Sequence, residues 1–414
     1  MRFALTMLVA GIVCASSLAA QTANEFQQDF GVAVERIGTL YAYFDAKATR
    51  WDDVASLYAA DTRAVTSRDE FIPLLERVLD ELYDPHTQLT VNLESSPRLV
   101  PSGTDLWAEW REGRAVITQV RDNSDAKRAG LRPGAVVIAI NGTPIDAAVE
   151  ARLGRSYPHT VAPARDWGLR AVLAGRHNSR RLLEVLEETV PRTVELAAGG
   201  QGRGGSELLE TSEIRPDIGY VRFNDSLGDS AAVAAFDHAL GRLRQTRGLI
   251  IDLRDTPSGG NSSVARGILG RFVEREMPYQ KHVLVVEERA TGVRRSWFEL
   301  VSPRGDFVYT RPVVVLVNRW TGSMGEGLAI GFDATGVATV VGTPMAGLLG
   351  ATTQIVLPGT GIRINVPFER LYHVNGTPRE NFEPAVLVDV TEAGFDDDPF
   401  IEAALKMLNG PVSQ

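Results

Sequence analysis

The sequence predicts an α/β protein made of three successive parts, because its hydrophobic periodicity changes twice along the 414 residues. Residues 24–94 carry apolar side chains at three- and four-residue spacing, which is typical of amphipathic helices. From about residue 106, short apolar runs separated by turn sequences replace this pattern and indicate strands. From residue 218 onward strands and helices alternate, which indicates a partly parallel sheet covered by helices.

The composition is that of a globular protein with more than one core. A chain of 414 residues is too long for one ordinary domain, so we expect two or three. Apolar residues make up 44% and charged residues 23%. The net charge of -9 argues against a general nucleic-acid binder, and an aromatic fraction of 7% gives no hint of a base-stacking surface. The sequence therefore predicts no nucleic-acid partner.

The first twenty residues differ from the rest and predict a signal peptide at residues 1–20. Arg2 gives a positive start, an apolar run covers residues 5–13, and small residues lead to a cleavage point near residues 19–21. The apolar run is too short for a stable bilayer span, so we expect no stable membrane insertion. A buried first helix is the alternative. The pattern favours an exported protein, periplasmic or secreted after cleavage.

Cys14 is the only cysteine, and it lies inside the predicted signal peptide. The cleaved chain could then form no disulfide, and cysteine catalysis and thiolate zinc sites are excluded. Apart from His86, the histidines show no metal-ligand spacing, so we expect no metal site. These histidines are His159, His177, His238, His282 and His373.

The middle part reads as a β-rich module. Residues 114–120 form one predicted strand and residues 135–140 another. The turn at residues 130–134 follows a short predicted helix, and Asn-Gly at residues 141–142 is a strong tight-turn signal. The glycine-rich stretch at residues 199–205 predicts a linker to the last part.

The last part reads as alternating strands and helices. The apolar run at residues 248–253 suits a strand that is covered on both faces. The predicted strands are residues 218–223, 248–253, 312–317 and 337–341, and the predicted helices are residues 231–243 and 323–332.

Ser323 stands where one of these strands passes into a helix. The apolar strand ends at Asn318, and Thr321-Gly-Ser-Met-Gly325 opens the helix. A serine at such an elbow is exposed, and the helix N-terminus favours developing negative charge. An N-cap serine is the alternative, since serine is among the best caps. The spacing differs from the G-x-S-x-G elbow because Thr321 replaces the first glycine.

Two further positions carry chemistry of the same kind. Gly259 and Gly260 follow a buried strand, where α/β sheets place their sites, and their free N–H groups could form half of an oxyanion hole. An ordinary glycine loop is the alternative. His86, beside Asp84 and Thr87 at a helix end, could be a positioned base, although a lone histidine is also common as a surface or cap residue.

In this order the motifs resemble those of the tail-specific, or C-terminal-processing, serine peptidase family. They are most similar to its tricorn-core and interphotoreceptor retinoid-binding-protein-like branch. The resemblance covers about residues 24–408, and it implies an N-terminal helical region, a PDZ-like domain at residues 95–198 and a crotonase-like ββα catalytic domain at residues 206–408. The motifs that carry it are residues 83–87, 129–142, 218–223, 248–253, 259–261 and 321–327.

The resemblance also implies roles for single residues. Ser323 corresponds to the nucleophile, and the oxyanion hole corresponds to the N–H of Met324 with that of Gly259 or Gly260. Leu348 stands where the lysine-using branch has its base, so the resemblance favours the histidine-using branch, in which His86 is the base.

Two supporting positions are less clearly matched. The late glutamate of the histidine-using branch corresponds best to Glu380, with Glu383 as the competing choice. Pro85 stands where that branch has a helper serine, and Thr87 is the nearest substitute. The PDZ-like domain has Trp107 and bulky or acidic neighbours where peptide-binding PDZ domains have a glycine-rich loop.

The expected function is that of an exported serine peptidase acting on proteins or peptides, with no cofactor. A hydroxyl needs a base within hydrogen-bond reach, and neutral imidazole can take its proton near neutral pH. The rival is a non-catalytic ligand- or peptide-binding protein on the same fold, because fold alone does not fix function. Homo-oligomerisation stays open at this level.

Overall fold

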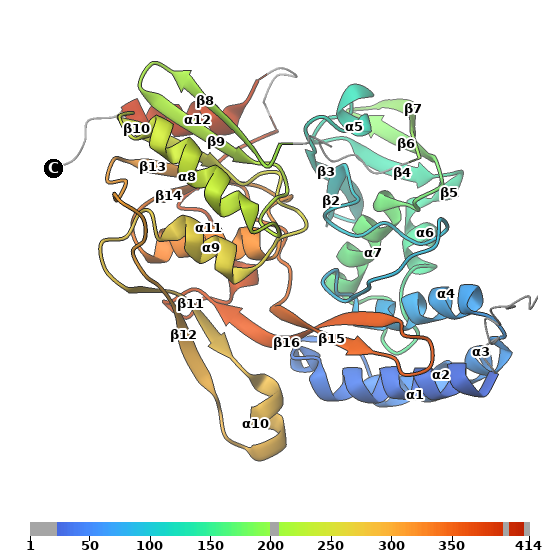
Figure 1. The fold of residues 1–414 in the computed structure, drawn as a ribbon. Helices are drawn as coiled ribbons and strands as arrows, with labels where there is room; N and C mark the ends of the chain where they lie inside the picture. Colours follow the sequence, from blue (N-terminus) through green and yellow to red (C-terminus); the bar gives the residue numbers. More distant parts are fainter. Residues whose placement is uncertain (1–22, 199–206, 392–396, 410–414) are drawn as a thin grey trace, which may run out of the picture.

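The computed structural model describes residues 23–198, 207–391 and 397–409. The predicted signal peptide and the predicted linker at residues 199–205 lie outside these ranges. Within them, the structure is a mixed α/β protein whose N-terminal part is helical, as the sequence predicts (Figure 1). No helix in the described ranges has both the length and the apolar character that crossing a membrane requires.

The N-terminal part is a set of helices that shares its core with a distant hairpin. Ser67 caps α4 by accepting a hydrogen bond from the N–H of Glu70. The buried side chains of these helices pack together with Ile364 and Val366 of β16, so this region is not a separate helical domain. The elements are α1 (Ala23–Leu40), η1 (Phe44–Ala46), α2 (Trp51–Leu57), α3 (Ala59–Ala64), α4 (Arg68–Leu79) and η2 (Asp80–Leu82).

The middle part, which we call the middle module, is an antiparallel sheet with its own buried core. Asn141 and Gly142 both have positive φ and form the predicted tight turn between β4 and β5. The sheet has the order β2-β3-β4-β6-β7, with β5 paired to β4. Its strands are β2 (Leu106–Arg111), β3 (Arg114–Val120), β4 (Val136–Ile140), β5 (Thr143–Pro144), β6 (Arg181–Glu187) and β7 (Val190–Leu196), with helices α5 (Asp125–Arg128), α6 (Ile145–Glu150) and α7 (Ala162–Ala174).

The last part is built on a six-stranded sheet of order β17-β14-β13-β10-β9-β8, in which only the β8–β9 pair is antiparallel. One face packs against α8, α9 and α11, and the other packs against α12 (Figure 1). Every residue of β10 and β13 is buried, which explains their continuous apolar sequences. The carboxyl ends of these strands meet at one edge, where sites form in such sheets. The elements are β8 (Leu209–Arg215), β9 (Ile218–Phe223), α8 (Ala231–Leu243), β10 (Gly248–Asp252), α9 (Ser262–Leu269), β13 (Val313–Val317), α11 (Met324–Ala334), β14 (Thr339–Gly342), β17 (Val386–Leu387) and α12 (Pro399–Asn409).

A second sheet joins the N-terminal helices to the last part. The short strand β1 begins two residues after His86 and pairs antiparallel with β16, with Gln88 opposite Asn365. This sheet has the order β1-β16-β11-β12, with β15 also paired to β16. Its elements are β1 (Gln88–Leu89), β11 (Met277–Val283), α10 (Val285–Thr291), β12 (Ser296–Val301), β15 (Ala351–Val356) and β16 (Arg363–Tyr372), and η3 (Arg379–Asn381) follows β16.

Candidate active site

Ser323 lies at a strained elbow between β13 and α11. Its φ of 50° falls in the left-handed region, which costs energy for a side chain other than glycine. Thr321 fixes the backbone that leads into the elbow, because its hydroxyl donates to the carbonyl of Leu253 at 2.9 Å. Ser323 is also the N-cap of α11. The two interpretations from the sequence, an elbow serine and an N-cap serine, therefore describe the same position. Ser323 is half-buried, and a hydroxyl held in strain at a helix N-terminus is suited to act as a nucleophile.

Gly259 packs directly against this elbow. A Cβ at Gly259 would lie 2.4 Å from Cβ of Ser323 and 2.9 Å from the backbone nitrogen of Met324, and φ there is +69°. The N–H of Gly259 donates to the carbonyl of Thr256 at 3.2 Å. In the described ranges, the N–H groups of Met324 and Gly260 donate no hydrogen bond. This pair is therefore available for an oxyanion, while Gly259 supplies the space beside it.

Glu326 is a buried carboxylate directly behind Ser323. It accepts hydrogen bonds from the N–H of Ser323 at 2.8 Å, of Gly347 at 2.9 Å and of Leu348 at 3.2 Å. Burial raises the pKa of Glu326 to about 7, against the opposing charge of Arg379. Our sequence reasoning missed Glu326, although Ser-x-x-Glu before an apolar helix is the capping-box pattern.

The loop at residues 347–350 contains Leu348, which stands where the lysine-using branch of the family has its base. Leu348 is buried, and its Cδ1 lies 3.2 Å from where a Cβ on Gly322 would be, so it packs beside the elbow. Arg379 holds the loop by donating to the carbonyls of Leu348 at 2.8 Å and Gly350 at 2.9 Å. The lysine position therefore adjoins the elbow but has an apolar side chain that cannot accept a proton.

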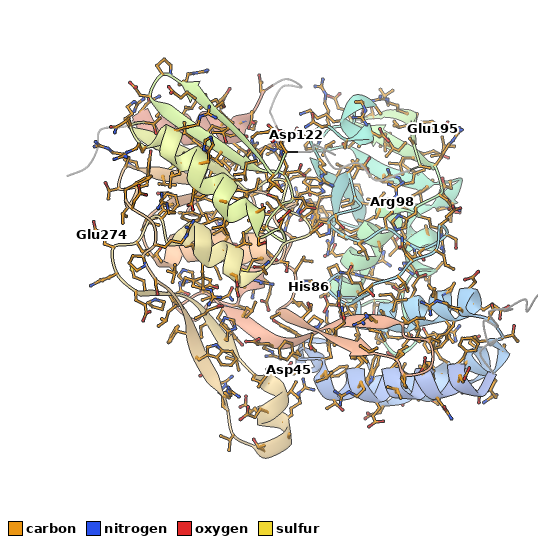
Figure 2. The ribbon with its side chains drawn as sticks, viewed as in Figure 1. Asp45, His86, Arg98, Asp122, Glu195 and Glu274 are labelled. Atoms are coloured by element: carbon orange, nitrogen blue, oxygen red, sulfur yellow. The ribbon has the colours of Figure 1, made fainter. Side chains whose placement is uncertain are left out.

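His86 reaches the same loop from the N-terminal part. Figure 2 shows it where the three parts of the molecule meet. Its Nδ1 lies 2.6 Å from the carbonyl oxygen of Leu349 and must donate to it, which leaves Nε2 of the neutral ring as an acceptor. Burial lowers the pKa of His86, and the charge of Arg379 lowers it further. Asp84 fixes the backbone by accepting the N–H of His86 at 2.9 Å.

Ser323 and His86 are therefore both held by the loop at residues 347–350, one through Glu326 and the other through Leu349. In the described part of the chain no hydrogen bond joins the two side chains directly. Catalytic hydrogen bonds are often long without substrate, so this geometry is compatible with either an active or a resting site.

Glu380 lies at η3 beside this group, and Glu383 does not. Oε2 of Glu380 is buried, and no partner for it occurs among the described residues. Burial raises the pKa of Glu380, and the nearby charge of Asp84 raises it further. Glu383 is exposed to solvent. Thr87 donates only a long hydrogen bond of 3.4 Å to Asp84, so it is not placed as a helper for the ring of His86.

Two residues that our sequence reasoning missed surround Glu380. The hydroxyl of Tyr43 is buried without a partner in the described ranges, and a Cβ on Gly350 would lie 3.0 Å from it. Burial lowers the pKa of Lys47, while the charges of Asp84 and Glu380 act against that shift. Neither residue stands in a recognisable motif. Among the described residues no group of His, Cys, Asp or Glu side chains is arranged to hold a metal ion.

The middle module contacts the two loops that carry the site. Arg121 binds Asp255 at 2.6 Å, and both side chains are buried. The indole N–H of Trp320, three residues before Ser323, donates to the carbonyl of Thr104 at 2.8 Å. Trp107 packs with Trp320, so it belongs to this contact rather than to the core of the module alone.

Comparison with known proteins finds two protease family models that match two parts of the chain. Residues 217–388 match peptidase family S41, and residues 22–80 match the tricorn protease C1 domain. The carboxyl-terminal-processing protease of Synechocystis sp. is 25% identical over 370 residues, which are 85% of this chain and 80% of that protein. The carboxy-terminal processing protease CtpB of Bacillus subtilis is 25% identical over 331 residues, and the match covers 76% of this chain and 62% of that protein.

Solved structures share the fold. Mature CPAF complexed with lactacystin superposes with a TM-score of 0.60 at 16% identity, over 93% of this chain and 98% of that one. The photosystem II D1 C-terminal processing protease gives a TM-score of 0.57 at 19% identity, over 93% and 97% of the two chains. The chain therefore carries an S41 peptidase domain at residues 217–388 and a tricorn C1 domain at residues 22–80, and the proteins it resembles over most of its length are proteases.

Proposed function

We propose that this protein is an exported serine peptidase that hydrolyses peptide bonds through an acyl-enzyme on Ser323, with His86 as the general base. The observation that carries the proposal is the hydrogen bond of 2.6 Å between Nδ1 of His86 and the carbonyl of Leu349. It fixes the tautomer whose Nε2 can accept a proton, and it does so on the loop that also holds the backbone of the nucleophile.

The chemistry follows from these positions. Nε2 of His86 takes the proton of the Ser323 hydroxyl as the oxygen attacks the substrate carbonyl carbon. The carbonyl oxygen becomes negative, and the N–H groups of Met324 and Gly260 stabilise it. The C–N bond then breaks as His86 returns the proton to the leaving amine. Water repeats the sequence on the ester, which releases the acid and restores the serine.

Glu380 and Arg379 have supporting roles in this proposal. The buried oxygen of Glu380 without a partner is available to a substrate, a water molecule or the ring of His86. Arg379 stabilises the loop at residues 347–350 through its two carbonyl contacts, and its charge disfavours protonation of His86 at rest.

The middle module is, in this proposal, the PDZ-like domain of the family, and the substrates are proteins or peptides. The relatives named as carboxyl-terminal-processing proteases suggest cleavage near substrate C-termini. Export through the signal peptide at residues 1–20 belongs to the same proposal and leads to a periplasmic or secreted location.

A mixture of unstructured peptides that differ at their C-termini tests this proposal. The purified protein should cleave a subset of them, and mass spectrometry should locate the cuts. The Ser323→Ala variant should leave the same peptides intact. Equal cleavage by wild type and Ser323→Ala would contradict the proposal, because the activity would then arise elsewhere.

A binding protein on the same fold is the second candidate. Two observations favour it: the apolar Leu348 at the lysine position, and the lack of a direct hydrogen bond between Ser323 and His86 in the described ranges. A binding protein would retain peptides of defined sequence without cutting them, and Ser323→Ala would bind them with unchanged affinity.

A further inference from the structure

The carboxylate of Glu326 joins the elbow at Ser323 to the loop at residues 347–350. The side chain is fully buried, and its two oxygens accept hydrogen bonds from three backbone N–H groups. Oε2 accepts the N–H of Ser323 at 2.8 Å and that of Leu348 at 3.2 Å, while Oε1 accepts the N–H of Gly347 at 2.9 Å. One side chain on the first turn of α11 therefore holds both segments together.

The same loop holds His86. The carbonyl oxygen of Leu349 lies 2.6 Å from Nδ1 of His86, one residue beyond the last N–H that Glu326 accepts. Ser323 is thus connected to His86 through Glu326 and residues 347–349. A shift of these residues would move the ring relative to the hydroxyl, and a misplacement of about 1 Å can cost about 100-fold in rate.

Two further contacts hold the loop, and neither of them titrates near neutral pH. The N–H of Ala346 donates to the carbonyl of Thr321 at 3.0 Å, which fixes the start of the loop. Arg379 donates to the carbonyls of Leu348 and Gly350, and a guanidinium stays protonated. Among the described residues, the titratable link between the elbow and the loop is therefore Glu326.

The three contacts of Glu326 are strongest when it is ionised. An ionised carboxylate only accepts hydrogen bonds, whereas the protonated acid also carries an O–H donor. Hydrogen bonds from N–H groups to a charged acceptor are about twice as strong as those to a neutral one. Proton uptake by Glu326 therefore weakens its hold on Ser323, Gly347 and Leu348 together.

Burial and charge act on Glu326 in opposite directions. Burial favours the neutral acid, whereas the guanidinium of Arg379, 3.9 Å from Oε2, favours the carboxylate. The balance raises the pKa of Glu326 to about 7.

Two other titratable groups border the loop. Glu380 is one, and its backbone carbonyl lies 3.7 Å from where a Cβ on Gly347 would be. His86 is the other, and burial together with the charge of Arg379 lowers its pKa below the ordinary 6.5. The ring of His86 is therefore already neutral at the pH where Glu326 titrates.

We propose that Glu326 is a positioning residue that sets the place of Ser323 relative to His86: its ionised form draws residues 347–350 against the elbow, and proton uptake releases them. The effect on activity rests on the proposed function, whereas the contact itself needs no substrate. Peptide hydrolysis then requires two deprotonated groups, neutral His86 and ionised Glu326. Glu326 is the one that limits the reaction in mildly acidic solution.

Steady-state kinetics on a cleaved peptide without histidine tests this role. In wild type, kcat/KM should rise with pH through about 7. Glu326→Gln keeps the shape but cannot ionise, so at pH 8 its kcat should fall at least about tenfold while KM stays within about twofold. Its activity should then decline only at the lower pH where His86 is protonated. An acid limb at the same pH in both proteins would overturn the proposal.

Asp29→Asn is the matched control. Asp29 is also fully buried, and it accepts the N–H groups of Gly359 at 2.8 Å and Thr360 at 2.7 Å. That loop lies at the other end of β15, whose 6 residues span about 20 Å. Asp29→Asn should loosen its own loop and leave kcat and its pH dependence unchanged. Equal losses of kcat in Asp29→Asn and Glu326→Gln would indicate general destabilisation and would rule out a positioning role.

Hydrogen exchange followed by mass spectrometry tests the contact without a substrate. Relative to intrinsic rates, the amides of residues 347–348 should exchange at least about tenfold faster at pH 6 than at pH 8 in wild type, and fast at both pH values in Glu326→Gln. Asp29→Asn should instead speed exchange at residues 359–360. Unchanged protection of residues 347–348 in Glu326→Gln would refute the link, whatever the activity. A loop that is released as expected, in a protein that cuts no peptide, would support the link and contradict the proposed peptidase function.

Discussion

At the scale of residues, the geometry of the site depends on three contacts around the loop at residues 347–350. Leu349 fixes the tautomer of His86, Glu326 fixes the backbone of Ser323, and Arg379 fixes the loop between them. None of these three supporting residues needs to touch a substrate. We therefore expect substitutions that fill space or remove a charge inside the site to lower activity more than substitutions of exposed groups nearby.

Gly259→Ala should abolish most of the activity. The added methyl group would overlap the Cβ of Ser323, and the positive φ of Gly259 disfavours any side chain. We expect kcat/KM to fall about 100-fold or more, the size of losing one oxyanion donor. Gly228→Ala is the control, because a Cβ there would meet its nearest atom only at 4.0 Å. Steady-state kinetics on one peptide compares them, and similar values for the two variants would speak against this geometry.

Glu380→Gln should lower kcat/KM by about tenfold or more, which corresponds to about 1.4 kcal/mol. The buried oxygen of Glu380 lies in the site, whereas Glu383 is exposed, so Glu383→Gln should change kcat/KM less than about twofold. Both variants remove one charge at neighbouring positions. A larger loss of kcat/KM in Glu383→Gln than in Glu380→Gln would show that the supporting role belongs to Glu383 and that our assignment to Glu380 is wrong.

At this scale the sequence predicted the candidates for nucleophile, base and oxyanion hole, because each stands in a local motif. Glu326 could have been found from its capping-box spacing. Tyr43 and Arg379 could not, because they come from segments more than 300 residues apart and carry no local pattern. Their positions depend on the tertiary fold alone.

At the scale of elements, the short strand β1 positions His86, the proposed base. It has only two residues, yet its pairing with β16 ties the segment after His86 to the last part of the chain. The apolar strands β10 and β13 were predictable because their runs are continuous. The β11–β12 and β15–β16 hairpins were not predicted, since β11 and β12 are mostly exposed or mixed in polarity and lack that signal.

The sheet that contains β11, β12 and β16 should lose stability at alkaline pH. Burial alone would lower the pKa of His282, but hydrogen bonds and charges from Glu299 and Glu369 raise it to about 9. Because the folded pKa lies above the ordinary 6.5, this contribution is complete below pH 6.5 and is lost as pH rises to about 9.

Chemical denaturation at several pH values measures this effect. The free energy of unfolding of wild type should fall between pH 6.5 and 9 relative to that of His282→Gln, which cannot bind the proton. His238→Gln serves as the control, and it should follow wild type across the range. A constant difference between wild type and His282→Gln would show that the ring does not titrate as the structure requires.

At the scale of the whole molecule, the middle module and the catalytic loops share a buried contact. Arg121→Ala should destabilise the protein by about 3 kcal/mol, because Asp255 would stay buried and, among the described residues, would keep only its ion pair with Arg222 at 3.4 Å. Arg114→Ala, which removes an exposed pair with Glu112, should cost less than about 1 kcal/mol. Equal unfolding midpoints in urea for the two variants would contradict a buried contact between module and loops.

The three-part organisation was predictable from changes in periodicity, and the structure confirms its helical beginning and mixed α/β character. The interleaving of the parts was not predictable. Core residues of the N-terminal helices lie beside Ile364 and Val366, and such long-range packing leaves no signal in local sequence.

The most direct test of the central claim is labelling of the purified protein by a fluorophosphonate probe, which reacts only with an activated serine. Wild type should label, Ser323→Ala should not label at all, and His86→Ala should label at least about 100-fold more slowly, the usual effect of losing a general base. Labelling that persists in Ser323→Ala, or that is unchanged in His86→Ala, would contradict the assignment of nucleophile and base. No labelling of wild type at any pH from 6 to 9, with peptides present, would instead favour the binding protein.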